Sequence, residues 1–163
     1  MDRINLILDT GWFGLLIWGA VCDMKTGRIP NKLSLALLLV SLSGIMREAW
    51  MLSRQLPFFR ALLYVLVQHG AAALTLALPM LLADLIRPGV FGGGDIKFAF
   101  AGGWLLTFSE AVHALAIAFA IGSLTALYYL SRKQKGRFRF GPALATGMSG
   151  ALFLSRFLLR ILG

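Results

Sequence analysis

Long apolar runs, interrupted by only a few charged residues, dominate this chain. Of its 163 residues, 58% are hydrophobic and 14% are charged, whereas a soluble domain is usually about half apolar and about a quarter charged. A soluble particle of 17.8 kDa could not bury so much apolar surface. The composition therefore excludes a soluble enzyme, a disordered chain and a nucleic-acid-binding domain, and it predicts an integral membrane protein made of helices.

The spacing of the apolar runs predicts an all-α, polytopic membrane protein with about six transmembrane helices in a single domain, residues 1–163. A membrane-spanning helix needs about 20 apolar residues, and polar turns separate the candidate runs. The mixed stretch between residues 47 and 60 is interpreted as interfacial. The expected helices cover approximately Ile4–Cys22, Leu33–Met46, Ala61–Ile86, Ile96–Phe108, Ala111–Leu130 and Pro142–Leu162.

The formal net charge of +9 comes from basic residues that gather between the apolar runs. They are interpreted as topology signals and as contacts for anionic lipid, not as a nucleic-acid surface. The loops after the first, third and fifth helices hold ten of the basic residues, and the opposite side holds six. The positive-inside rule then places these three loops in the cytoplasm and both termini outside.

Two of the seven acidic residues stand where chemistry is expected. Asp23 closes the first expected helix and Asp95 opens the fourth, so both lie at a similar depth on the cytoplasmic side. An ionisable group near the hydrocarbon is costly and indicates function. Two nearby carboxyl groups do not both ionise readily, so such a pair holds one proton, as an aspartic protease requires. No metal and no covalent intermediate are needed for that reaction.

Three glycines, Gly92, Gly93 and Gly94, precede Asp95. Without side chains, they can approach a substrate closely and adopt positive φ, so an extended substrate could pair with this loop. The same residues also fit an ordinary loop in which Asp95 caps the following helix. Asp23 likewise fits a solvated turn residue.

The other polar residues have simpler interpretations. Asp84 and Arg87 lie three residues apart and predict an ion pair at a helix end. Glu110 is interpreted as a turn residue on the opposite face. His69 and His113 have no metal-ligand spacing, and no metal site is predicted.

Three segments resemble motifs of the type IV prepilin leader peptidases. Residues 23–31, DMKTGRIPN, resemble the D-x(6)-P-N segment of that family, and residues 92–97, GGGDIK, look like its G-x-G-D-x-K motif. Residues 140–145, FGPALA, are similar to a third and weaker signature, F-G-P-x-L-A. The resemblance covers nearly the whole chain.

The resemblance implies a six-helix aspartyl endopeptidase of the prokaryotic inner membrane. Such enzymes remove short basic leaders from type IV prepilins or pseudopilins at the cytoplasmic face. Asp23 and Asp95 correspond to the catalytic pair, and no cofactor is implied for the cleavage. The remaining candidate site residues, for loop or substrate contacts, are Gly92, Gly93, Gly94, Lys97, Pro30 and Asn31.

A second activity of the family stays open. Its larger members carry paired C-x-x-C motifs and also methylate the new pilin N-terminus with S-adenosylmethionine. This chain has a single cysteine, so a role for S-adenosylmethionine is in question.

Two other functions are compatible with the same residues. A small transporter would use Asp23 or Asp95 as a proton relay, but it would need matching repeats or broken helices, and the sequence shows neither. A non-catalytic membrane subunit would use the aspartates structurally, and it predicts mild effects when either is replaced.

Overall fold

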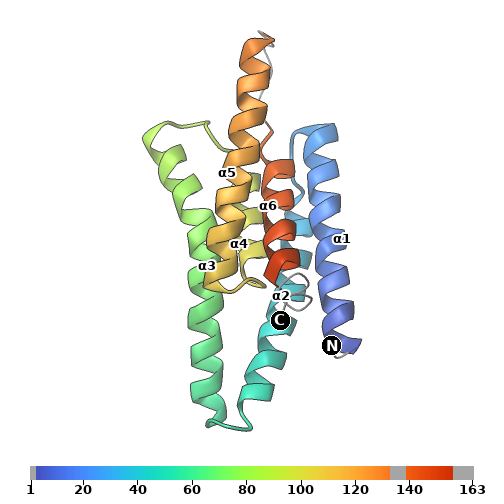
Figure 1. Ribbon diagram of the computed structural model, residues 1–163, viewed down its shortest axis with the longest axis vertical. Helices are drawn as coiled ribbons and strands as arrows, with labels where there is room; N and C mark the ends of the chain where they lie inside the picture. The colour runs from blue at the N-terminus through green and yellow to red at the C-terminus, as the bar shows by residue number, and fades with distance from the viewer. Residues whose placement is uncertain (1–2, 133–138, 156–163) are drawn as a thin grey trace.

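The computed structural model describes residues 3–132 and 139–155, which form six helices and no strand (Figure 1). The prediction of an all-α, polytopic membrane protein is confirmed. Four helices, α1, α2, α3 and α5, are long and apolar enough to cross a membrane. The helices are α1 (Arg3–Thr26), α2 (Asn31–Leu52), α3 (Phe58–Ile86), α4 (Gly93–Gly103), α5 (Phe108–Ser131) and α6 (Gly141–Phe153).

The central helix α4 is shorter than a membrane span. Its 11 residues extend over roughly 16 Å, against a hydrocarbon core of about 30 Å. It packs against α1, α2, α3 and α6, and Phe98 in its second turn is fully buried. Because α4 is so short, it begins at one end of the bundle and its last residue, Gly103, lies in the interior of the bundle.

The helices on either side of the expected interfacial stretch, residues 47–60, are longer than predicted. Helix α2 continues to Leu52, a short turn follows, and α3 begins at Phe58. Ile45 and Ala49 of α2 are buried against Val65 of α3. This packing extends both helices beyond the segment that hydropathy alone marks as apolar, because burying an apolar face stabilises a helix more than local preference does.

Consecutive helices run antiparallel, so three connections share one end of the bundle. The turns after α1 and after α3 lie at this end, together with the end of α5 and the start of α6 (Figure 1). We call it the site end. The last part of the expected sixth helix, residues 156–162, lies outside the described ranges. Lys133, Lys135 and Arg137 of the predicted basic loop also lie outside them.

Small residues bring the helix backbones into close contact. A Cβ atom added to Gly103 of α4 would lie 2.6 Å from the Cα of Ala73 in α3, and one added to Gly147 of α6 would lie 2.4 Å from the carbonyl oxygen of Ala114 in α5. Helices in lipid associate through such close packing, since hydrocarbon removes most of the hydrophobic driving force. These glycines therefore hold the short helices inside the bundle.

The turn between α4 and α5 is closed by a capping box. The Glu110 carboxylate accepts the Thr107 N–H at 2.7 Å, and the Thr107 hydroxyl accepts the Glu110 N–H at 3.4 Å. Ser155, beyond α6, also donates its hydroxyl to Glu110. Glu110 is a residue of this turn, as predicted, but it is buried inside the bundle and joins the start of α5 to the end of α6.

Replacing Gly147 by alanine should destabilise the protein by about 1–3 kcal/mol, the usual cost of overpacking, because the new Cβ meets backbone atoms of α5. Gly150→Ala is the matched control on the same helix, since its Cβ would meet only the Ile117 side chain at 3.7 Å. Thermal unfolding in detergent should show a lower midpoint for Gly147→Ala alone. Equal midpoints for the two variants would contradict the close packing of α5 and α6.

Candidate active site

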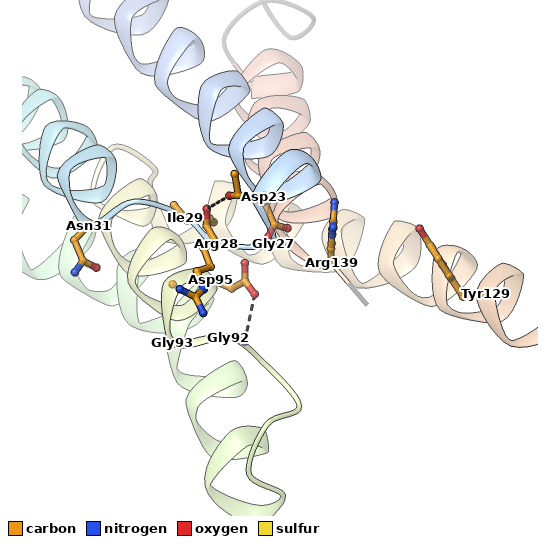
Figure 2. A pocket seen from close by; sticks show the side chains of 12 residues that line it. Asp23, Gly27, Arg28, Ile29, Asn31, Gly92, Gly93, Asp95, Tyr129 and Arg139 are labelled. Carbon is orange, nitrogen blue, oxygen red and sulfur yellow. Dashed lines mark hydrogen bonds between the residues drawn. The ribbon is translucent and has the colours of Figure 1, made fainter. Parts of the chain in front are cut away.

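A cavity of about 790 Å³ opens at the site end, and it contains both predicted acids. Asp23 comes from the last turn of α1 and Asp95 from the first turn of α4. Figure 2 shows their side chains pointing into the same gap. The residues that line the cavity are Asp23, Thr26, Gly27, Arg28, Ile29, Asn31, Gly92, Gly93, Gly94, Asp95, Tyr129 and Arg139.

The Asp23 carboxyl group is held by the start of α6. The side chain is buried, with 4% of the residue exposed, and its Oδ2 accepts the backbone N–H of Gly141 at 3.1 Å. A Cβ atom at Gly141 would lie 2.7 Å from Oδ2, so only glycine fits beside the carboxyl group. This contact explains why a Phe-Gly-Pro segment far along the chain belongs to the site.

A glycine turn redirects the chain immediately after Asp23. Gly27 has a φ of 65°, the left-handed conformation that ends many helices, and its N–H donates to the Asp23 carbonyl at 2.8 Å. Pro30 then occupies the N-cap position of α2 with a φ of −64°. Helix α2 therefore begins at Asn31, two residues before the expected Leu33, and the turn places Asn31, but not Pro30, in the cavity lining.

Asp95 both lines the cavity and caps its own helix. Its Oδ2 accepts the Gly92 N–H at 3.3 Å, while the Gly92 carbonyl accepts the Asp95 N–H at 2.9 Å. Helix α4 therefore begins at Gly93, before the expected Ile96. The alternative of a glycine loop with Asp95 as the N-cap is wrong, because Gly92 is the N-cap of α4 and Asp95 lies at the third helical position, from which its carboxylate bonds back to Gly92.

The positive φ expected for the three glycines before Asp95 is wrong. Gly92 has a φ of −76°, Gly93 and Gly94 belong to the first turn of α4, and among the described glycines only Gly27 and Gly89 have positive φ. A helical turn offers no extended edge for strand pairing. First-turn N–H groups have no acceptor within their own helix, so they can instead donate to a group bound in the cavity.

Gly94 allows α4 to approach the turn between α1 and α2. A Cβ atom there would lie 3.5 Å from the backbone of Ile29, whereas one at Gly93 would meet nothing within 4 Å. Gly93 therefore faces the open cavity, and Gly94 faces the opposite wall.

Asp84 has a role that the sequence interpretation missed. The predicted ion pair with Arg87 is wrong, because Asp84 directs Oδ1 to the loop before the glycines. This oxygen accepts the N–H of Gly89 at 2.8 Å and the N–H of Phe91 at 3.4 Å. Asp84 thus fixes the chain that leads into Gly92, and the Pro-Gly pair at residues 88–89, a turn signal, was the available clue.

Two arginines accompany the acids in the cavity, and neither was predicted as a site residue. Figure 2 shows Arg28 and Arg139 on either side of Asp23 and Asp95. Two cations beside two acids keep the cavity from carrying the strong positive charge of the chain as a whole. The phenol of Tyr129 closes the same side as Arg139.

Lys97 lies outside the cavity lining, at its border. Its Nζ donates to the Asn31 Oδ1 at 3.5 Å and so links α4 to the start of α2. His69, by contrast, interacts at 3.1 Å with Glu48, away from the cavity lining. Within residues 3–132 and 139–155, no three His, Cys, Asp or Glu side chains form a group suited to a metal ion.

One comparison with known proteins bears on this site. The model of the type IV leader peptidase family matches residues 11–127, which include both acids and the glycines before Asp95. No curated protein and no solved structure matches the chain.

Replacing Gly141 by alanine should displace the Asp23 carboxyl group, because the new Cβ would stand 2.7 Å from Oδ2. The lost hydrogen bond and the overpacking should lower the stability by about 1–3 kcal/mol. Gly93→Ala is the control from the same cavity, since its Cβ meets open space. A thermal unfolding midpoint for Gly141→Ala as high as that of Gly93→Ala would contradict the placement of Asp23 against α6.

Proposed function

Because the chain belongs to the type IV leader peptidase family, we propose that it is an aspartyl endopeptidase acting on prepilins. It removes the short basic leader of type IV prepilins or pseudopilins. The observation that carries this proposal is the presence of Asp23 and Asp95 in one cavity at one end of the membrane helices. Family membership favours this function over a transporter or a non-catalytic subunit.

The proposed reaction uses one shared proton. The ionised aspartate takes a proton from water, the water oxygen bonds to the scissile carbonyl carbon, and the neutral aspartate gives its proton to the carbonyl oxygen. The tetrahedral intermediate then loses the amine: the aspartate that took the proton from water gives it to the nitrogen, and the carbon–nitrogen bond breaks. At the same time one hydroxyl of the intermediate gives its proton to the other aspartate and becomes the new carbonyl. The two acids return to their starting state without a cofactor.

Backbone donors support this chemistry by fixing each carboxyl group. Gly141 donates to Asp23 and Gly92 donates to Asp95, so both acids are oriented before the substrate arrives. Such positioning lowers the barrier because less reorganisation is needed in the transition state.

We place the site end at the cytoplasmic face of the inner membrane, with both termini outside. The support is the larger number of basic residues in the loops at this end. Anionic lipid at this face would attract the basic loops, and it would also keep a basic leader near the membrane surface. The acids and arginines of the cavity then meet the substrate without a large repulsive field.

Asp23→Asn and Asp95→Asn should each lower the rate of leader cleavage by at least about 10²–10⁴-fold, the range for loss of a general acid or base. Asparagine keeps the size and an acceptor oxygen, so the N–H donors of Gly141 and Gly92 remain satisfied and the protein should fold. The measurement is the mass of the products from a prepilin peptide incubated with purified protein in detergent.

Glu48→Gln provides the control for these substitutions, because Glu48 is an acid outside the cavity lining and should leave cleavage unchanged. Full activity in either aspartate variant would refute the paired-acid mechanism. Adding S-adenosylmethionine to the same assay tests the second activity: a gain of one methyl group at the new N-terminus shows methylation, and an unchanged mass shows cleavage alone.

A further inference from the structure

A second hollow, of about 660 Å³, lies between α2, α3 and α4. We call it the lateral groove. Its walls are large apolar side chains, and its polar residues are few. The walls are formed chiefly by Leu35, Leu38, Leu78, Leu81 and Phe100.

The floor of the lateral groove is made of small buried residues. Ser34, Ala77 and Ala101, one from each helix, are all less than a tenth exposed. A floor of this kind lets the backbone of another helix approach closely, as it does where Gly103 meets Ala73 in the same bundle. A lipid chain needs no such small floor, so the shape favours a helix.

The lateral groove runs parallel to the axis of α3. Leu74, Leu78 and Leu81 line it from α3, and residues four and seven apart lie on one helix face. At 1.5 Å per residue this wall is roughly 10 Å long. A rod-shaped apolar segment therefore fits along it.

The lateral groove adjoins the active-site cavity. Asn31 lines both hollows, and Lys97, which donates to Asn31, stands at the border only two residues after Asp95. Figure 2 shows Asn31 and Tyr129 on opposite sides of the acids. A polypeptide cut between the acids must leave the cavity in two directions, and the side of Asn31 leads into the groove.

The charge of each part of the substrate determines which part can enter the lateral groove. A basic leader cannot enter an apolar groove without losing its hydration, and the one ionisable residue lining the groove, Lys97, carries the same sign. We propose that the lateral groove binds an apolar helical segment of the substrate that follows the scissile bond. This inference rests on the proposed peptidase function.

The kinetic test compares two substrates. One carries the leader and an apolar segment after the cleavage site, and the other is a short peptide that ends soon after that site. Leu78→Trp should narrow the groove and lower the ratio of kcat/KM for the long substrate over the short one by about tenfold, through KM, because binding that is equal in the ground and transition states is lost.

Leu63→Trp is the matched control. Leu63 lies on the same helix, with 52% of the residue exposed against 45% for Leu78, and it does not line the groove. The control should leave the ratio at the wild-type value. An unchanged ratio in Leu78→Trp, with both substrates cleaved by the wild type, would overturn the docking inference and leave the peptidase proposal standing. Cleavage of neither substrate would refute both.

A crosslinking test identifies the occupant even where a tryptophan perturbs folding. A photoreactive benzoylphenylalanine is placed at position 81, or at position 63 as control, in the Asp95→Asn protein reconstituted in vesicles with the long substrate. An adduct with the apolar segment of the substrate from position 81 alone supports the proposal. Adducts only with lipid, or only with a second copy of this chain, would overturn it.

Discussion

The whole arrangement depends on one constraint: two carboxyl groups must be held in place at one end of an apolar bundle. Polar groups that leave water need hydrogen-bond partners, and here backbone N–H groups supply them. Gly141 donates to Asp23 and Gly92 donates to Asp95. Because both donors lie at helix starts, the two acids fix where α4 and α6 begin. The small residues of the bundle allow the close packing that brings those helix starts beside the end of α1.

Much of the site could be predicted from residues close together in the sequence. The turn signal between Asp23 and Pro30 and the glycines before Asp95 mark two helix boundaries, and boundaries of antiparallel helices meet at the ends of a bundle. The expectation that Asp23 and Asp95 share one end is confirmed by the cavity that both line. Their assignment as catalytic residues rests on the proposed function, and the resemblance identified the family correctly.

The misses share a physical cause, because each depends on a tertiary contact that periodicity does not encode. Helix α2 continues beyond the end of its apolar run because Ile45 and Ala49 pack on α3. Glycines before Asp95 look like a loop in isolation, yet the Asp95 carboxylate caps them into a helical turn. Asp84 lies three residues from Arg87, but the N–H groups of Gly89 and Phe91 are better placed for its carboxylate. Arg139 joins the site only through the folding of α6 against α1.

The short helix α4 combines three tasks in 11 residues. Its first turn presents Asp95 to the cavity, one face with Lys97 and Phe100 borders the lateral groove, and the opposite face with Phe98 and Gly102 is buried in the core. With 3.6 residues per turn, each of these faces is only one or two residues wide. Small residues on the core face let the neighbouring helices come close to α4. The cavity, the lateral groove and the core all include residues of α4. A substrate segment bound in the lateral groove is therefore held at a fixed distance from Asp95. That distance along α4 determines which peptide bond of the substrate reaches the two acids.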